Sequence, residues 1–255
     1  MTNRLRGAIV LGVTVAVFAA VFLFVPPIHQ PEDYHQFADT RTFFGISRAW
    51  NVLSNLGFLL VGALGLKFLW SSESAQTFAD PRERWPYAIL FIGVLLTCFG
   101  SGYYHLAPDD ARLVWDRLPM TLGFMGLVSA IIAERISVRL ALGLLVPLFV
   151  LGASSVFYWQ SSGDLRLYAL VQFFPALLIP LILWLYPARY TGLRELGFAA
   201  LGYVAAKVFE AADSPVFSVT GGIVSGHTLK HLAAAWGVWW ILRMLQVRKA
   251  CECGN

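Results

Sequence analysis

The sequence predicts an all-α, polytopic membrane helix bundle with a seven-helix core and one extra N-terminal transmembrane helix. Hydrophobic residues make up 58% of the 255 residues, charged residues only 13%, and the mean hydropathy is +0.65. Soluble domains carry about 25% charged residues. The apolar residues also gather in runs of roughly 20, the length of helix that crosses ~30 Å of hydrocarbon. Only short polar or proline-containing joints separate these runs, which leaves no room for a soluble domain.

The first run, residues 7–25, follows Arg4 and Arg6. It could be a signal peptide or a signal anchor. Its end, VFLFVPP, lacks a clear small-x-small cleavage site, and the run is longer than a usual signal-peptide core. We therefore expect a retained N-terminal transmembrane helix or signal anchor over 1–26, followed by an extracytoplasmic loop over 27–48.

The later runs predict a seven-helix domain over 49–247, with a polar tail over 248–255. Lys207 and Glu210 make the sixth of these seven spans the least apolar, and such residues should face a protein interior rather than lipid. Because they are three residues apart on one helix, we expect them to pair. The expected spans are 50–70, 86–106, 113–133, 138–158, 166–186, 196–212 and 226–246.

Basic residues predict the orientation. If the spans alternate in direction, twelve of the 19 Lys and Arg residues fall on the side of the N-terminus. The positive-inside rule then predicts that both termini are cytoplasmic. The same flanking residues explain the net charge of +4, so we expect no nucleic-acid partner. Cys98 lies in an apolar run, and Cys251 and Cys253 lie in the tail, which does not make a disulfide framework.

Polar residues gather at the extracytoplasmic ends of three expected spans. The span 86–106 runs outward and ends in GSGYYHL, 113–133 returns inward from LVWDRLPM, and 226–246 starts on the same outer side at SGHTLKH. These segments place five polar residues at one membrane depth, namely Ser101, His105, Asp116, His227 and His231.

Their residue types suit metal-dependent hydrolysis. His227 and His231 are four apart and can share a helix face. With His105 from another helix, they form the three-ligand set of catalytic zinc, which leaves one position for water. Asp116 could take a proton from that water, and Ser101 could donate a hydrogen bond to the developing oxyanion. Alternatively, the histidines bond headgroups or carbonyl groups, and Asp116 only interacts with a helix dipole.

At these residues the sequence resembles the alkaline ceramidase family, within a superfamily of seven-helix metal-dependent hydrolases that also includes adiponectin-receptor-like proteins. The matching segments are AWNVLSNLGFLLVG at 49–62, GSGYYHLAPDDARLVWDRLPM at 100–120 and SGHTLKHLAAAW at 225–236. The resemblance covers about residues 37–246 and implies cleavage of the amide bond of ceramide or a related N-acyl lipid to a fatty acid and a sphingoid-type amine. The zinc-site residues it implies are Ser101, His105, Asp116, His227 and His231.

One segment departs from the family pattern. Eukaryotic members carry an acidic, calcium-binding segment before WNxxSN, whereas this chain has HQFADTRTFFGISRAWN. Phe37 and Arg48 stand where carboxylates would be expected, and Asp39 is the most plausible acidic residue left. We therefore do not predict a calcium site. His29 and His35, in the same loop, have no spacing that recruits them to the zinc site.

Several further residues have two interpretations. Asn51, Ser54 and Asn55 start a span on the outer side and could hold the zinc-binding histidines by hydrogen bonds, or they could cap a helix or bond between helices. Glu210 or Asp213 could orient a zinc-binding imidazole instead of forming other pairs. We expect the Lys230 side chain to reach the membrane interface or to bind a lipid phosphate.

Two other functional classes are weighed against hydrolysis. A seven-helix receptor or sensor would use zinc structurally, but structural sites normally have four protein ligands, and the sequence offers no evident fourth. A transporter would show broken helices in matching halves, and no such symmetry is seen. The apolar interior also offers no other charge cluster that suggests a proton or ion path. The oligomeric state stays open.

Overall fold

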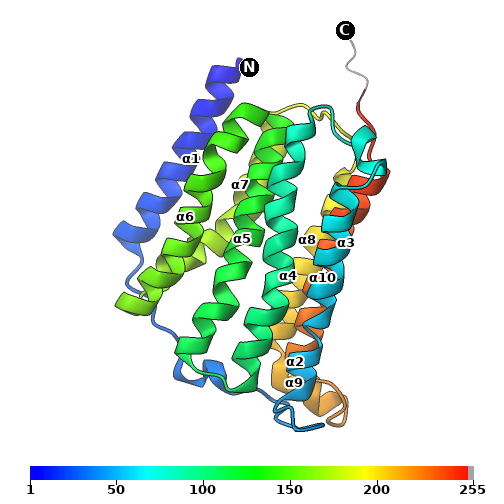
Figure 1. Cartoon of the computed structure of the whole chain (residues 1–255). Coiled ribbons are helices and arrows are strands. Elements are labelled where there is room, and N and C mark those ends of the chain that lie inside the picture. The colour runs from blue at the N-terminus through cyan, green and yellow to red at the C-terminus, as the bar shows by residue number, and fades with distance from the viewer. Residues whose placement is uncertain (252–255) are drawn as a thin grey trace.

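The computed structural model describes residues 1–251, and over these residues the chain is an all-α bundle, which confirms the predicted fold class (Figure 1). Residues 252–255 of the predicted polar tail, with Cys253, lie outside the described residues. Short 3₁₀ helices lie at Glu32–His35, Glu73–Gln76 and Pro81–Glu83. The α-helices are α1 (Asn3–Phe24), α2 (Ala49–Leu53), α3 (Leu56–Leu69), α4 (Arg84–Leu106), α5 (Asp110–Arg135), α6 (Val138–Ser162), α7 (Arg166–Leu185), α8 (Leu193–Ala211), α9 (Asp213–Val219) and α10 (Gly226–Val247).

Within residues 1–251, six helical segments are long and apolar enough to cross a membrane. Helices α8 and α10 have 19 and 22 residues, comparable to these six, but they carry charged or histidine side chains along their length. Large apolar side chains such as Leu60, Phe99 and Leu177 are exposed on the outside of the bundle, which suits a lipid-facing surface. The six segments are Asn3–Phe24, Ala49–Leu69, Pro81–Leu106, Asp110–Arg135, Val138–Ser162 and Arg166–Leu185.

The predicted span 50–70 is broken into α2 and α3. At the break, the Ser54 hydroxyl donates to the Asn51 carbonyl oxygen at 3.2 Å, and the Asn55 amide donates to the same oxygen at 2.7 Å. Serine and asparagine compete in this way with the helical hydrogen bonds of the backbone. The break therefore lies at the polar residues that the sequence pattern singled out.

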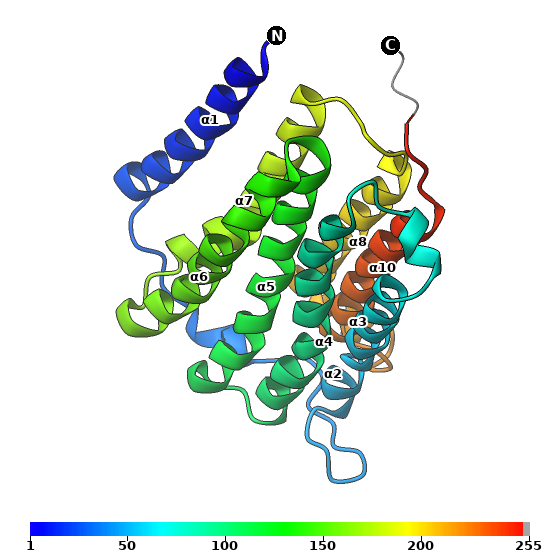
Figure 2. The same cartoon turned by 45° about the horizontal axis from the view of Figure 1, so that its top comes forward.

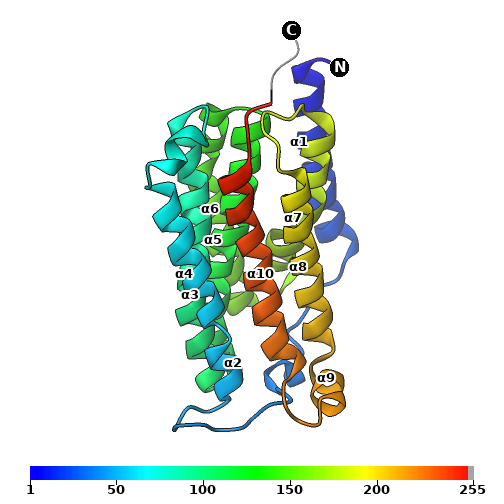
Figure 3. The ribbon, with the colours of Figure 1, turned by 90° about the vertical axis from the view of Figure 1, so that its right-hand side faces the viewer.

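Glycines allow the helices of the bundle to approach closely. A Cβ atom added to Gly100 in α4 would lie 2.0 Å from the Trp115 carbonyl oxygen in α5. Similarly, a Cβ on Gly202 in α8 would lie 2.6 Å from the Gly237 Cα atom in α10. Small residues permit such contacts between membrane helices. Figure 3 shows α8 and α10 side by side along their length.

Helix α1 lies at the margin of the bundle, where it packs along α7 (Figure 2). Phe18 meets Phe174 edge to face, with ring centroids 5.5 Å apart. The start of α1 and the end of α10 lie at the same end of the bundle, whereas the loop before α2 and helix α9 lie at the opposite end (Figure 1).

A second buried charge cluster lies at the end of the bundle where α10 ends. The Arg248 guanidinium pairs with Glu134, which also accepts a 2.5 Å hydrogen bond from the Tyr87 hydroxyl. Beside them, the Tyr190 hydroxyl donates to Glu83 at 2.6 Å. The three charged residues are at most 7% exposed. These partners come from separate parts of the chain, so no local pattern could show the cluster. Because its members are paired, we interpret it as a tie between helix ends.

Candidate metal centre

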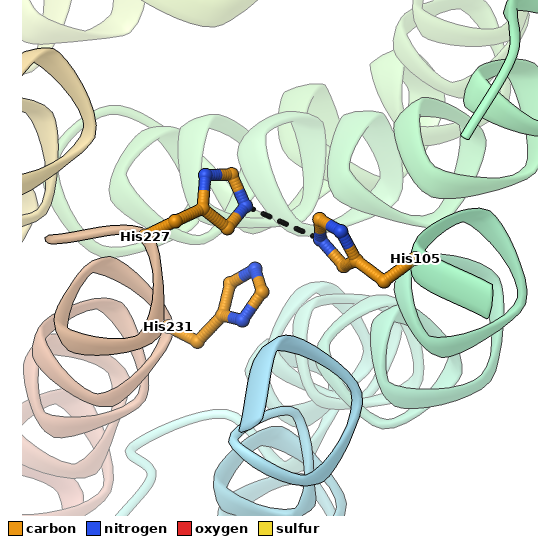
Figure 4. A group of neighbouring side chains, drawn as sticks. All are labelled: His105, His227 and His231. Carbon is orange, nitrogen blue, oxygen red and sulfur yellow. Dashed lines mark hydrogen bonds between the residues drawn. The ribbon is translucent and has the colours of Figure 1, made fainter. Parts of the chain in front are cut away.

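Three buried imidazoles from α4 and α10 point toward one another (Figure 4). His105 lies in the last turn of α4, and His227 and His231 lie in the first turns of α10. The Nε2 atoms of His105 and His227 are 3.2 Å apart, and one ring nitrogen from each histidine lies within 4.8 Å of the others. The three residues are 1%, 6% and 3% exposed. This group could hold a metal ion.

The start of α10 is set by two acceptors that satisfy helix-terminal amides. The Ser225 hydroxyl caps the helix by accepting from the Thr228 amide at 3.1 Å. The Asp213 carboxylate accepts from the His227 amide at 2.8 Å through one oxygen, and from the Ala38 amide at 2.9 Å through the other. Asp213 therefore holds the backbone of His227, not its ring, and ties the loop before α2 to this helix end.

Ser54 selects the tautomer of His231. Its Oγ atom lies 2.8 Å from the His231 Nδ1 atom, and its hydroxyl donates to the Asn51 carbonyl oxygen. A hydroxyl has one hydrogen, so Ser54 must accept from Nδ1–H. The Nε2 atom of His231 then keeps its lone pair for a metal. Of the two interpretations of Ser54, the structure supports the one in which it holds a histidine.

Asn51 and Asn55 act differently from Ser54. The Asn51 side-chain oxygen accepts from the Thr228 hydroxyl at 3.0 Å and from the Ser225 hydroxyl at 3.4 Å. Asn51 thus bonds between helices α2 and α10. Asn55 donates to backbone carbonyls of its own segment. Neither amide touches an imidazole ring through a hydrogen bond within residues 1–251.

His105 is held less completely than His231. Its Nδ1 atom is buried and has no hydrogen-bond partner in the described part of the chain. The Nε2 atom faces His227, so Nε2 is the nitrogen that points to the centre of the group. The protein therefore fixes the tautomer of His231 but leaves that of His105 to the ligand it binds.

Ser101 and Asp116 come from the two helices that approach each other at Gly100, which are α4 and α5. Both side chains are buried, at 2% and 7% exposed. Ser101 lies four residues before His105 on α4. Asp116 is not a member of the three-histidine group.

The lysines of α8 and α10 share one carboxylate. Lys207 pairs with Glu210, as predicted. Lys230 also binds Glu210, with its Nζ atom 2.6 Å from Oε1. The expectation that Lys230 reaches the membrane interface or a lipid phosphate was therefore wrong, because α10 turns this side chain toward α8. Glu210 is occupied by the two lysines and does not orient an imidazole.

The loop before α2 covers the histidines. The Phe37 ring lies 4.8 Å from the His105 ring and 4.5 Å from the His227 ring, centroid to centroid. Asp39, predicted as the acidic residue left in this segment, is 1% exposed and binds Arg41 through both oxygens, at 2.8 and 2.6 Å. Burial alone would raise the pKa of Asp39, but the hydrogen bonds from Arg41 hold it below its usual range.

Two further residues hold this loop, and the sequence pattern did not identify either. His35 bonds the Tyr104 hydroxyl at 2.9 Å and Asp110 at 3.1 Å, away from the metal group. The buried Arg117 donates to the Gln30 side chain at 2.6 Å. Its guanidinium also lies 4.0 Å from the centroid of the Trp159 ring in α6. In the sequence, only the position of Arg117 next to Asp116 could have drawn attention to it.

Neither the protein-family models nor the curated proteins with which the chain was compared match it. The chemistry of the site therefore has to be inferred from its residues. The three buried imidazoles could bind a metal ion.

Proposed function

We propose that this protein is a zinc-dependent intramembrane hydrolase that cleaves the amide bond of ceramide or a related N-acyl lipid. The products would be a fatty acid and a sphingoid-type amine. The observation that carries the proposal is the buried convergence of His105, His227 and His231. The choice of substrate rests on the resemblance of three segments to the alkaline ceramidases.

The donor set favours zinc and an open site. Imidazole nitrogens suit zinc among divalent metals, and three protein ligands are the number that catalytic zinc sites use, whereas structural sites are closed by four. Within residues 1–251 the group contains three histidines and no fourth member. This composition supports an enzyme over a receptor or sensor with structural zinc. Bound zinc would supply a water that is activated near neutral pH.

Asp116 would move the protons. It takes a proton from the water whose oxygen bonds to the carbonyl carbon, and it delivers that proton to the amine nitrogen as the carbon–nitrogen bond breaks. Ser101, four residues before His105 on α4, donates a hydrogen bond to the carbonyl oxygen, which becomes negatively charged during the reaction.

The position of the site suits a lipid substrate. The histidines lie at helix ends, so a bond just below the lipid headgroups can reach them while the acyl chain stays among apolar helices. We propose cytoplasmic termini and a site near the extracytoplasmic face. The distribution of Lys and Arg supports this orientation, as does the location of the start of α1 and the end of α10 at the end of the bundle opposite α9 (Figure 1).

The test combines metal analysis with a mass-spectrometric screen of N-acyl lipids on the purified protein. Asp116→Asn should retain zinc but lower the hydrolysis rate about 10²- to 10⁴-fold, the usual contribution of a general base. Asp110→Asn is the matched control, since Asp110 lies on the same helix with a side chain that is 65% exposed. Failure of the zinc-loaded protein to cleave any N-acyl lipid, or full activity of Asp116→Asn, would overturn the proposal.

A further inference from the structure

Lys230 lies on α10 between two histidines of the metal centre. It follows His227 by three residues, and side chains at this spacing are neighbours on a helix surface. Its side chain is only 16% exposed, and its Nζ atom is 2.6 Å from Glu210 in α8. The ammonium group therefore lies inside the bundle between α10 and α8, on the helix that carries two of the three histidines.

The groups around Lys230 come from several elements. Glu210 of α8 binds it directly, and His227 and His231 lie on its own helix, three residues before it and one residue after it. Tyr34 approaches from the loop before α2. Burial raises the pKa of the Tyr34 phenol, so this neighbour brings a neutral hydroxyl and not a negative charge.

Glu210 alone does not satisfy Lys230. Its two oxygens are shared between Lys230 and Lys207, so this cluster of three charges has an excess of one positive charge. An ammonium has three N–H donors, and Glu210 is the one hydrogen-bond or ion-pair partner of Lys230 within residues 1–251. Because buried cations are stable only with compensating partners, the remaining donors favour an anionic oxygen.

We propose that Lys230 is an anion-binding residue of the catalytic centre, which holds first the oxyanion of the attacked carbonyl and then the carboxylate of the fatty acid product. This inference rests on the proposed function. The negative charge appears on the carbonyl oxygen when the water oxygen bonds to carbon, and it is relieved when the carbon–nitrogen bond breaks. Lys230 keeps its proton throughout. The carbonyl oxygen carries negative charge only once the water oxygen has begun to bond to carbon. A fixed cation beside that oxygen therefore stabilises the transition state more than it stabilises the neutral substrate.

The experiment compares two ligands with the same alkyl chain. Dodecylphosphonate presents a tetrahedral anion, and dodecanamide presents a neutral carbonyl. Calorimetry measures the affinity of both for the zinc-loaded and the metal-free full-length protein in detergent. The variants are Lys230→Met, Lys230→Arg and, as the matched control, Lys207→Met. Lys230→Met leaves Glu210 paired with Lys207, so the substitution strands no carboxylate.

Lys230→Met should weaken phosphonate binding about 10- to 100-fold, the value of a hydrogen bond to a charged group, and should change amide binding less than about twofold. The loss should persist in the metal-free protein, because Lys230 donates directly, and Lys230→Arg should restore part of it. Unchanged phosphonate affinity in Lys230→Met, or an equal loss in Lys207→Met, would overturn the inference. An inactive wild type with Lys230-dependent phosphonate binding would instead refute the hydrolase proposal and leave the anion site standing.

Discussion

Replacement of Ser54 by alanine is expected to weaken metal binding without unfolding the protein. Ser54 touches no metal itself. It accepts from the Nδ1–H group of His231 at 2.8 Å, at a position where both residues are less than 9% exposed. Alanine removes that acceptor, so the His231 ring loses the group that fixes both its orientation and the location of its proton.

The size of the effect follows from the role of the hydrogen bond. Loss of a group that holds a metal-binding histidine typically lowers metal affinity 10- to 100-fold, which corresponds to about 1.4 to 2.8 kcal/mol of binding free energy. The hydroxyl of Ser54 also donates to the Asn51 carbonyl oxygen. That oxygen keeps the 2.7 Å hydrogen bond from Asn55 in the variant, so the helix break itself should survive.

Competition with a chromophoric zinc chelator measures the affinity of the purified protein in detergent. Ser155→Ala is the matched control, because Ser155 is also fully buried but donates within its own helix, to the Gly152 carbonyl oxygen at 2.6 Å. Ser54→Ala should bind zinc 10- to 100-fold more weakly than Ser155→Ala, with a similar unfolding temperature. Equal zinc affinity in the two variants would show that the bond to His231 does not prepare the site.

Three further predictions address other parts of the molecule. His105→Ala should reduce zinc to far below one ion per chain, measured by plasma mass spectrometry, and a full complement of zinc would remove His105 from the ligands. Arg248→Met should lower the free energy of unfolding by about 3 to 5 kcal/mol, because it leaves the Glu134 carboxylate buried without its cation, and an unchanged denaturant midpoint would contradict this. Hydrogen bonds from Arg166 hold the pKa of Asp164 at about 2, below the ordinary value of ~3.9. The ionised Asp164 carboxylate therefore stabilises the fold above pH ~4. This contribution to stability is lost as the pH falls toward about 2. Asp164→Asn should therefore flatten the decrease in unfolding temperature between pH 4 and 2, and an identical decrease in the two proteins would refute the pairing.

The sequence predicted the helices well because a membrane-spanning helix must satisfy length and apolarity within its own segment. The predicted runs 138–158 and 226–246 correspond to α6 (Val138–Ser162) and α10 (Gly226–Val247). The break at Ser54 was not predicted, although its polar residues were noted. Neither was helix α9, which is too short to produce a periodic apolar pattern.

The sequence predicted which histidines form the candidate site, but not how the helices turn them toward one another. The order of spans places the end of one helix and the start of another at the same depth, and the spacing of four places His227 and His231 on one face. Sequence alone could not supply the rotation of the helices about their axes. Rotation depends on contacts such as Gly100 against Trp115 and Gly202 against Gly237, between residues with no sequence relation.

Length, apolarity and residue spacing thus determined where the long helices lie in the chain and that His227 and His231 share one helix face, because each is a property of one segment in its solvent. The tertiary structure decided that Lys230 turns to Glu210, that Ser54 accepts from His231, and that Phe37 covers the imidazoles. It also decided that Arg248 meets Glu134 inside the bundle. These contacts are set when helices pack against each other at fixed rotations, and that packing depends on many distant side chains at once.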